Sequence, residues 1–490
     1  MRKAHLIILY VDSSTDEELK LQRGSFSPSP CRDQSSKKNM DMWNEMKKGS
    51  ERGQTYRMVP LKGYHPLGCN RKRNALSITQ YVLRAKIDYE SKNGTMRDPA
   101  IYRCVVGISH NRTGGAYNVY PLYGFACPVV DSAEGVTHAL RSNEYHDSEE
   151  QYYPRFHCRI SLYYWFLKHI PGIRRDIIIK DFSRVNFTYT VLSKRKLQWF
   201  IDQGYATGWD DPRLPTIQGA VRRGLTMRAL RQFIFDLGDS RRAVNLQIDQ
   251  LWSFNKKIID PEVPRYTALV KENIVPVIIH GGEGATVWIE SAKRSLPYPK
   301  SPNGTLLVPL HPKNPAMGLK TIRTSPEILL QQFDAADLFP GMEVTLMGWG
   351  NIIITGRSLA EGSSDIVSSL TAELHLDGSP KTTKHKLTWL PADPGSLLSI
   401  VLVEYGNLVT KDILSKKDTF TEHVNQNTHT VVQCYADPNV GALAEGTKVQ
   451  FERIGYARLD QRGTEATPSS FVVIPSGSST IFLKEATIKL

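Results

Sequence analysis

The segment over residues 191–197 has the residue types and spacing best suited to chemistry on a charged ligand. It reads V-L-S-K-R-K-L and places Ser193 directly before the three cations Lys194, Arg195 and Lys196. An ammonium held in such a segment can stabilise negative charge that develops on a phosphate. A Ser-Lys pair among basic residues is nevertheless most often a solvated surface loop. The segment by itself leaves both interpretations open.

A second stretch, over residues 120–147, mixes aromatic, sulfur-containing and charged side chains. Its guanidinium, Arg141, could bind a carboxylate through two parallel hydrogen bonds. Considered singly, Tyr123 and His138 are ordinary core residues and Arg141 is an ordinary surface cation. Residues 120–147 therefore indicate a binding site only when they are considered together with the rest of the sequence.

The overall charge favours an anionic partner. Sixty-two Lys and Arg outnumber 49 Asp and Glu, which gives a net charge of +13 and a pI near 9.3. This balance is typical of proteins that bind nucleic acid, although a basic, merely solvated surface explains an excess of this size equally well. The six cysteines form no C-x-x-C pair, so we expect no metal site, no disulfide framework and a reducing compartment. No apolar run is long enough to span a bilayer, so we expect a cytoplasmic protein that does not associate with a membrane.

The elements that must position these residues change character along the chain. A length of 490 residues exceeds what one hydrophobic core supports, so several domains are expected. The apolar run over residues 4–11 predicts a buried strand, and residues 102–106 and 117–120 predict two more strands among turn signals. Residues 57–80 show neither periodicity nor caps, as in an insertion. The first part of the chain is therefore expected to be α/β.

Two antiparallel helices are predicted next. Thr226 can cap a helix that Gly238 ends, and Ser240 can cap a second helix that Asp260-Pro261 closes. The apolar faces repeat at helical spacing and comprise Leu230, Phe233, Ile234 and Leu237 in the first helix and Val244, Ile248, Leu251 and Trp252 in the second.

Beyond about residue 270 the apolar spacing changes to two, which predicts strands. Residues 370–376 and 387–389 flank the turn Asp377-Gly378 in the pattern of a hairpin. Residues 344–346, which precede Gly350, and residues 449–453 repeat the pattern at spacings typical of sandwiches or barrels. The C-terminal half is therefore expected to be all-β.

In this context the sequence resembles the class I aminoacyl-tRNA synthetases. Residues 191–197 are similar to their K-M-S-K-S signature loop, in the form found in the glutamyl and glutaminyl enzymes, and residues 120–147 are similar to the family's substrate-binding strand and helix. The resemblance is to glutamyl-tRNA synthetases of the eukaryotic and archaeal type. Further similarities follow in the family's order from about Trp43 to the C-terminus, at residues 83–88, 95–99, 208–213, 260–266 and 311–315.

The resemblance implies roles for individual residues. Lys194 would be the catalytic cation, and ATP would be used as a substrate together with Mg²⁺. Gly124 stands where the family usually has Asp, which weakens the amino-acid site at that position. The implied ATP-binding residues are Glu144, Val191, Leu192, Ser193, Lys194 and Arg195; the glutamate-binding residues are Tyr123, Gly124, Phe125, Ala126, Cys127 and Arg141; the tRNA-binding residues are Asp147 near the acceptor end and Arg265 near the anticodon loop.

The resemblance also implies a fold, α/β plus all-β. Residues 1–200 would form a partial class I Rossmann catalytic domain with an acceptor-binding insertion. Residues 201–265 would form a short helical connecting domain, and residues 266–490 an antiparallel β-barrel anticodon-binding domain. The implied partners are tRNA(Glu), L-glutamate and ATP, with multi-synthetase partners in the full-length protein.

The implied activity is ATP-dependent attachment of glutamate to tRNA(Glu) through glutamyl-adenylate. Arg141 favours glutamate, because an amide substrate would leave a buried guanidinium without its charge partner. Glutaminyl-tRNA synthetase is one alternative, and a noncatalytic tRNA-binding fragment is another. The family's H-I-G-H signature is not found, so we expect the first half of the catalytic domain to be absent, which would leave this chain inactive. Residues 57–80 and 153–164 also lack family counterparts.

Overall fold

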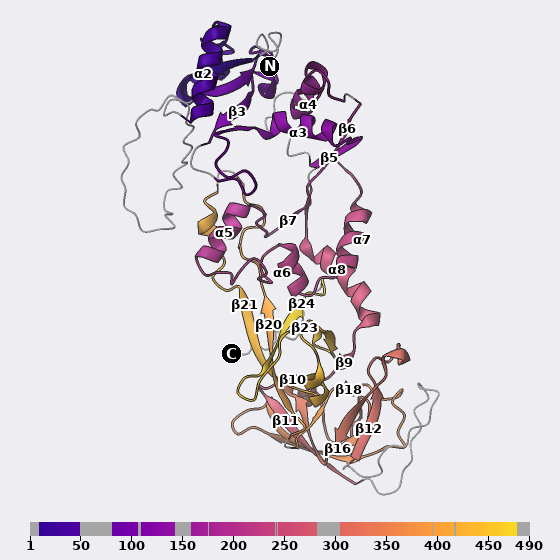
Figure 1. Cartoon of the computed structure of the whole chain (residues 1–490). Coiled ribbons are helices and arrows are strands. Elements are labelled where there is room, and N and C mark those ends of the chain that lie inside the picture. Colours follow the sequence, from indigo (N-terminus) through magenta and orange to yellow (C-terminus); the bar gives the residue numbers. More distant parts are fainter. Residues whose placement is uncertain are drawn as a thin grey trace. The chain divides into compact units, whose positions relative to one another are not determined.

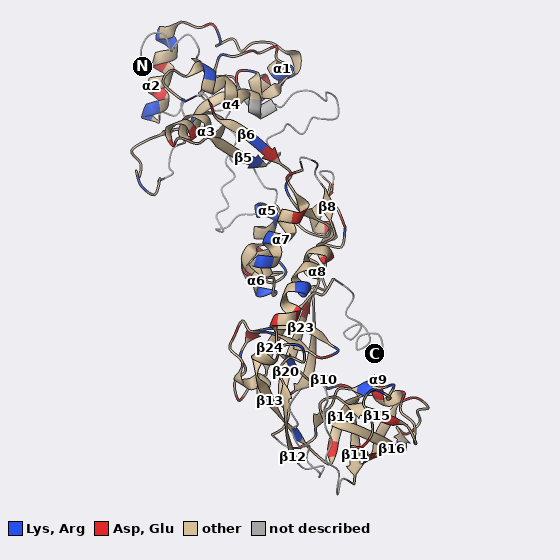
Figure 2. Ribbon diagram, turned by 90° about the vertical axis from the view of Figure 1, so that its right-hand side faces the viewer, with Lys and Arg blue, Asp and Glu red and all other residues tan. Residues whose placement is uncertain are grey.

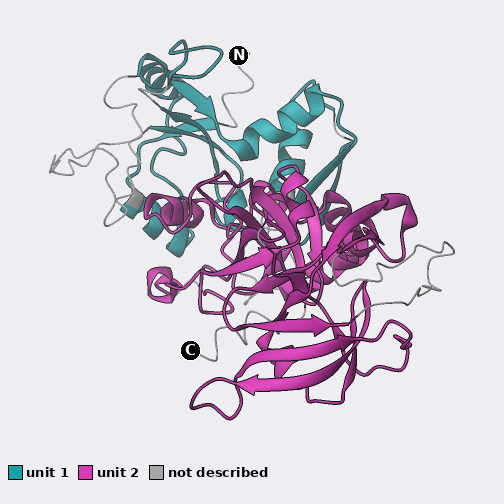
Figure 3. Cartoon of the chain, turned by 90° about the horizontal axis from the view of Figure 1, so that it is seen from below, with its two compact units in different colours: residues 1–184, 239–243 teal, residues 185–238, 244–490 magenta. Residues whose placement is uncertain are grey.

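The computed structural model describes residues 9–49, 81–105, 109–142, 158–174, 176–240, 242, 244–281, 304–393, 395–415 and 418–477. The chain divides into two compact units, residues 1–184 with 239–243 and residues 185–238 with 244–490 (Figure 3). We call them unit 1 and unit 2 and describe each by itself. None of the helices in the described ranges is long and apolar enough to cross a membrane.

An antiparallel sheet, four-stranded in the described part, forms the centre of unit 1 (Figure 1). Its strands follow the chain order and are β1 (Leu9–Asp12), β2 (Val82–Ala85), β3 (Ala100–Cys104) and β4 (Val119–Pro121). The buried strand predicted at residues 4–11 is confirmed over its described part, where Tyr10 and Val11 are buried. The two later predicted strands are present as β3 and β4 with shifted bounds.

Helices and a parallel strand pair complete the described part of unit 1. They are α1 (Asp16–Ser25), α2 (Ser36–Lys48), α3 (Tyr123–Ala133) and α4 (Cys158–His169), with β5 (His138–Ser142) beside β6 (Ile178–Phe182). Thr15 caps α1 in a capping box with Glu18. Met42 and Met46 of α2 and Phe166 of α4 belong to the same apolar core as the sheet. The parallel pair β5–β6 is the element that a partial Rossmann domain requires.

The two stretches without family counterparts have different outcomes. Residues 57–80 and 153–157 lie outside the described residues. Residues 158–164 form the first part of α4, in which Leu162 and Tyr163 are buried. The second stretch therefore contributes to the core of unit 1.

Unit 2 begins with helices and a short parallel strand pair. These elements are β7 (Asn186–Phe187), α5 (Lys194–Asp202), α6 (Ile217–Arg222), α7 (Met227–Leu237), β8 (Asn245–Leu246) and α8 (Ile248–Ile259). The predicted cap of α7 is confirmed, because Thr226 Oγ1 accepts a hydrogen bond from the Ala229 amide at 3.1 Å. Phe233 is buried as predicted, but Ile234 and Leu237 are exposed, so the predicted apolar face is only partly the buried one.

The predicted start of the second helix is wrong. α8 begins at Ile248 and not after Ser240. The residues between them include β8, which pairs in parallel with β7. Pairing with this distant segment overrides the helical spacing of Val244 and Ile248. α8 ends as predicted, directly before Asp260.

Two curved sheets make up most of the rest of unit 2, and they confirm the predicted β-barrels. The first barrel contains β9 (Arg265–Tyr266), β10 (Ala268–Val270), β20 (Leu398–Tyr405), β21 (His429–Ala436), β22 (Lys448–Phe451), β23 (Gly455–Gln461) and β24 (Ser469–Ile474). The second barrel contains β11 (Ile274–His280), β14 (Glu327–Gln331), β15 (Glu343–Leu346), β16 (Gly350–Leu359), β17 (Val367–Leu374), β18 (Lys386–Leu387) and β19 (Leu390–Pro391). The hairpin β12 (Gly304–Pro309) and β13 (Leu319–Thr324) and the short helix α9 (Gln332–Ala336) accompany them.

The order of the strands brings the two ends of each sheet together. The end strands of the first sheet, β9 and β10, are separated along the chain only by Thr267, and those of the second, β18 and β19, only by Thr388 and Trp389. Successive Cα atoms lie about 3.8 Å apart, so the two ends of each sheet must meet. Most strand pairs are antiparallel, although β9–β22, β20–β24, β11–β17 and β15–β18 are parallel.

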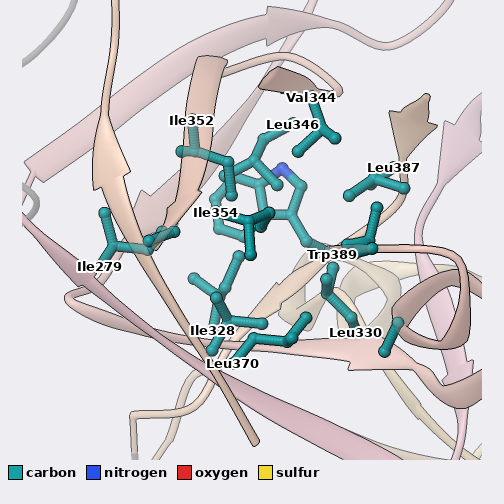
Figure 4. Close-up of a cluster of buried hydrophobic side chains, with 14 of the residues drawn as sticks. Ile279, Ile328, Leu330, Val344, Leu346, Ile352, Ile354, Leu370, Leu387 and Trp389 are labelled. Carbon is teal, nitrogen blue, oxygen red and sulfur yellow. The ribbon is translucent and has the colours of Figure 1, made fainter. Parts of the chain in front are cut away.

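The core of the second barrel explains the period-two pattern of the sequence. Leu370 of β17 and Trp389 are buried there (Figure 4). Ala372 and Trp349 belong to the same core, and the ring centroids of Trp349 and Trp389 lie 5.0 Å apart. The hairpin predicted around Asp377-Gly378 is wrong, because β17 pairs with β16 and β11 whereas β18 pairs with β15. The strands expected at residues 344–346 and 449–453 are present as β15 and β22.

Candidate functional site

The basic segment around Lys194 opens helix α5. Ser193 is the N-cap residue but its side chain makes no capping hydrogen bond, and the first turn holds no acidic residue. Lys194 and Arg195 are exposed, whereas Val191 is buried just before them. The ribbon in Figure 2 marks basic residues on α5. Leu192 is also exposed, with 36% of its surface accessible.

This arrangement suits an anion. The first amide groups of a helix have no partner within the helix, and its N-terminus carries partial positive charge. Cations in the first turn are therefore unfavourable unless a negatively charged group compensates them. Phosphate groups bind at helix N-termini for the same reason. The start of α5, with Lys194 and Arg195 beside uncapped amides, can hold phosphate oxygens.

A segment of the first barrel, described over residues 406–415 and 418–427, holds α5 in place. The backbone amide of Tyr189, just before the basic segment, donates to the Asp412 carbonyl at 2.7 Å. The Trp199 and Phe420 rings meet edge to face with centroids 5.1 Å apart, and the Lys196 ammonium lies 5.1 Å from the centre of the Phe420 ring. Lys196 thus faces the barrel segment, in contrast to exposed Lys194.

Arg141, on β5 in unit 1, lies in a polar cluster with one carboxylate. Its Nη2 donates to Asp131 Oδ2 at 3.1 Å and to Cys127 Sγ at 2.7 Å. Its guanidinium lies 4.4 Å from the centre of the Tyr163 ring, and the Tyr163 hydroxyl donates to the same Asp131 oxygen at 2.8 Å. The Arg141 side chain is 14% exposed. Its hydrogen bonds to described residues all run through Nη2, so Nε and Nη1 have no described partner.

Sequence reasoning missed the two residues that hold Arg141. Asp131 precedes Arg141 by ten positions on α3, and Tyr163 follows on α4, in a stretch without a family counterpart. The Tyr163 hydroxyl is protonated and donates to Asp131 at neutral pH; burial, followed by this hydrogen bond, raises the pKa of Tyr163 still further above neutral. No periodicity connects these positions, and a carboxylate near an arginine in sequence is the only available signal.

The other predicted amino-acid-site residues lie on the first turns of α3, not on a strand. Tyr123 is 55% exposed, whereas the Phe125 ring packs against Tyr102 and Phe166 with centroids 5.4 and 5.2 Å away. A Cβ at Gly124 would lie 3.6 Å from Leu162, an ordinary contact. Over residues 120–147 the described structure has the end of strand β4, then helix α3 and then strand β5, so the expected strand-then-helix order is present in β4 and α3 and a further strand follows it.

Cys127 and Ala126 are half-buried on the same helix. Burial raises the pKa of the Cys127 thiol, so the group accepting from Arg141 is a neutral sulfur. Glu144 and Asp147 lie outside the described residues. The structure therefore brings Arg141 and Cys127 together in unit 1 and Val191 to Arg195 together in unit 2.

Arg265 lies on β9, at the junction of α8 and the first barrel. Its Nη2 donates to Asp260 Oδ1 at 3.4 Å, and the Tyr456 hydroxyl donates to the same oxygen at 2.5 Å. The Asp260 carbonyl lies 3.0 Å from Nε2 of buried His311. Asn314 Nδ2 donates to the Pro261 carbonyl at 3.2 Å. Residues 311–315 and 260–266, both singled out in the sequence, therefore form one junction.

No group of three or more His, Cys, Asp or Glu side chains in the described ranges is placed to hold a metal ion. ATP with its Mg²⁺ would instead be met by the start of α5, where phosphate oxygens can be bound. Mg²⁺ characteristically binds substrate phosphates and keeps several waters, so the donors near Lys194 fit a phosphate-borne ion.

Comparisons with known proteins cover most of the chain. The profile of the class I (E and Q) tRNA synthetase catalytic domain matches residues 70–261, and two profiles of the anticodon-binding domain of the same enzymes match residues 263–375 and 386–460. Cytoplasmic glutamate–tRNA ligases from Saccharomyces cerevisiae and Arabidopsis thaliana are 39% and 38% identical over 96% of this chain, covering 58% and 57% of their own lengths. The bifunctional glutamate/proline–tRNA ligase of Mus musculus is 40% identical over 96% of the chain and 28% of its length. The chain thus spans little more than half of the cytoplasmic relatives.

Proposed function

Because the chain belongs to the class I tRNA synthetases for glutamate and glutamine, we propose that it is part of a glutamate–tRNA ligase. Such an enzyme attaches glutamate to tRNA(Glu) through glutamyl-adenylate at the cost of ATP. The observation that carries the proposal is the start of α5, where uncapped amides lie beside exposed Lys194 and Arg195, within a chain whose residues 70–261, 263–375 and 386–460 match these enzymes. The relatives from Saccharomyces cerevisiae and Arabidopsis thaliana are named cytoplasmic, and we propose the same compartment.

The residues act by positioning and by charge. Attack of the glutamate α-carboxylate on the α-phosphorus of ATP forms glutamyl-adenylate, breaks the α–β phosphoanhydride bond and releases pyrophosphate. Negative charge increases on the phosphates during the attack, and the Lys194 ammonium stabilises it. Arg195 and the first amides of α5 bind the same phosphates, while the barrel segment over residues 406–415 and 418–427 holds the helix. Mg²⁺ travels with ATP and supplies further charge compensation.

Arg141 supports glutamate as the amino acid. The Arg141 guanidinium has no described partner at Nε and Nη1, so these groups can donate hydrogen bonds to a second carboxylate in addition to Asp131. The side-chain carboxamide of glutamine is uncharged. Glutamine would therefore compensate the positive charge of the largely buried Arg141 less than glutamate does. Multi-synthetase association is a further proposal, suggested by the bifunctional relative.

A noncatalytic tRNA-binding role is the rival, and one sequence observation favours it. No H-x-G-H sequence occurs in the 490 residues, and helix N-terminal amides with imidazoles at such a signature hold ATP phosphates opposite the Lys194 side. We therefore expect the 490-residue chain to bind tRNA with an affinity that falls as salt rises, but not to form glutamyl-adenylate. Filter binding at two salt concentrations tests the expected tRNA binding. Glutamate-dependent pyrophosphate exchange tests whether glutamyl-adenylate forms. Robust exchange would favour a complete active site, and absence of salt-sensitive binding would refute the tRNA assignment.

The junction residue Arg265 should read the anticodon end of tRNA. Arg265→Ala is expected to weaken binding of cognate tRNA by about 1 to 3 kcal/mol, because a charge-assisted contact is lost. Arg265→Lys retains the charge and serves as the matched control, since removing Arg265 also frees Asp260. Filter binding with tRNA(Glu) and with a tRNA of unrelated anticodon measures the effect. An equal loss for both tRNAs would mean that Arg265 contacts only the phosphate backbone.

A further inference from the structure

The chain turns just before the basic segment of unit 2. Strand β7 ends at Phe187, and Thr188 and Tyr189 form a turn that leads to Val191 and the start of α5. Tyr189 has a φ of 56°, in the left-handed region of backbone conformation. Crowding around Cβ disfavours this region for residues other than glycine, and asparagine tolerates it better than an aromatic residue does. A tyrosine therefore stays in this conformation only if the contacts around it hold it there.

The polar contacts of Tyr189 are those of its backbone. Tyr189 is 42% exposed, and its hydroxyl has no hydrogen-bond partner in the described part of the chain. Its ring also meets no other aromatic ring and no cation among these residues. The side chain thus gives no polar reason for the left-handed conformation.

Hydrogen bonds to two different elements bracket the turn. The Thr188 amide donates to the Leu246 carbonyl of β8 at 2.9 Å, and the Tyr189 amide donates to the Asp412 carbonyl of the barrel segment at 2.7 Å. The Thr190 hydroxyl donates back to the Thr188 carbonyl at 3.1 Å. Because these bonds involve three consecutive residues, they fix the direction in which the chain leaves β7.

The acceptor of the Tyr189 amide is itself fixed. Val409 and Val424 form an antiparallel bridge that closes the barrel segment, and the Thr410 amide donates to the His423 carbonyl at 2.9 Å. Asp412 lies inside this closed segment. Its carbonyl is therefore a stationary acceptor for the turn.

The direction of the turn also determines where the basic segment lies. Val191 follows directly after the turn and is buried in the same apolar core as Val409 and Leu197. Helix α5 begins at Lys194, three positions after Val191. The turn thus places the buried valine, and the buried valine places the uncapped amides and the exposed ammonium at the start of α5.

We infer that Tyr189 is a positioning residue for the phosphate-binding start of α5, and that it acts through its left-handed backbone and not through its ring. The inference rests on the phosphate site proposed at Lys194. A residue with this role can be replaced by one that adopts the left-handed conformation easily. A β-branched residue at the same position opposes that conformation and displaces the site.

The test titrates the 490-residue chain calorimetrically with inorganic tripolyphosphate as the probe. Tyr189→Val is expected to weaken binding by about fivefold or more, because its branched Cβ disfavours the left-handed conformation. Tyr189→Gly and Tyr189→Asn lose the same ring but should retain the affinity of the parent chain within about twofold. Tyr117→Val is the matched control, because it removes an exposed tyrosine at a position without left-handed backbone.

Two further measurements separate positioning from a general loss of stability. In a Lys194→Ala background, Tyr189→Val should weaken the remaining binding far less, since the two residues act on the same contact. A general loss of stability would instead lower the affinity by the same factor in both backgrounds. Hydrogen exchange of the amides over residues 190–202, measured without ligand, should be faster in Tyr189→Val and unchanged in Tyr189→Gly.

The results can contradict the inference in distinct ways. A loss of affinity in Tyr189→Gly equal to that in Tyr189→Val would assign the effect to the ring and overturn it. Parent-like affinity or parent-like hydrogen exchange in Tyr189→Val would overturn it as well. Failure of the proposed phosphate site appears in the parent chain itself, as tripolyphosphate binding that is absent or that Lys194→Ala leaves unchanged. That result would remove the site that Tyr189 is inferred to position, whatever the Tyr189 variants do.

Discussion

Lys194→Ala should lower the rate of glutamyl-adenylate formation by about a hundredfold or more, by comparison with other single electrostatic donors. The Lys194 ammonium is exposed at the start of α5, where uncapped amides already favour a phosphate. Its charge matters most while negative charge builds up during attack on the α-phosphorus, so the loss should fall on the rate more than on ATP affinity. The measurement is glutamate-dependent pyrophosphate exchange in a fusion that joins this chain to the preceding segment of a cytoplasmic relative.

Two control variants separate the role of Lys194 from a general loss of charge. Lys256→Ala removes an exposed cation from α8 in the same unit and should change the exchange rate little. Lys194→Arg retains the charge with a different shape and should recover part of the activity. An exchange rate in Lys194→Ala equal to that of the parent fusion would remove Lys194 from the mechanism.

Local signals in the sequence predicted those elements whose stabilising contacts are also local. Thr226 caps α7 as expected, because the cap needs only the amide of Ala229 three residues on. The strands β15 and β16 form a hairpin around a short turn for the same reason. The period-two residues Leu370 and Ala372 predicted a buried strand, since alternation directly reflects a face packed on a core.

Elements whose partners lie far along the chain could not be predicted in this way. The turn Asp377-Gly378 suggested a hairpin, but β17 is already flanked by β16 and β11, so residues 386–387 pair elsewhere. The helix expected after Ser240 gives way to β8, whose partner β7 lies some sixty residues earlier. Sequence spacing carries no information about such partners.

The candidate site follows the same division. The segment over residues 191–197 could be singled out as a candidate phosphate-binding segment because Ser193 and its cations are contiguous, but the helix that begins at Lys194 was not predicted. The environment of Arg141 could not, because Asp131 and Tyr163 reach it from two different helices. The roles of the site residues stay predictions, and the variants at Lys194 and Arg141 are their tests.

Arg141→Ala should raise the KM for glutamate and erode the preference for glutamate over glutamine in the same fusion. Loss of one partner of a desolvated charge pair costs roughly 2 to 5 kcal/mol. Aminoacylation kinetics with both amino acids measure the change. Undiminished discrimination in Arg141→Ala would mean that another residue selects glutamate. Because Arg141→Ala also leaves Asp131 without its cation, Arg141→Lys is the necessary companion, since lysine keeps the charge but lacks the planar fork.

Tyr163→Phe examines how Arg141 is held. The substitution keeps the ring 4.4 Å from the guanidinium and removes only the hydroxyl that donates to Asp131. With one donor fewer, Asp131 should attract Arg141 more strongly and draw it from the ligand, so the KM for glutamate should rise while kcat changes little. A fall in kcat without a change in KM would mean that Tyr163 supports the fold of the site and not amino-acid recognition.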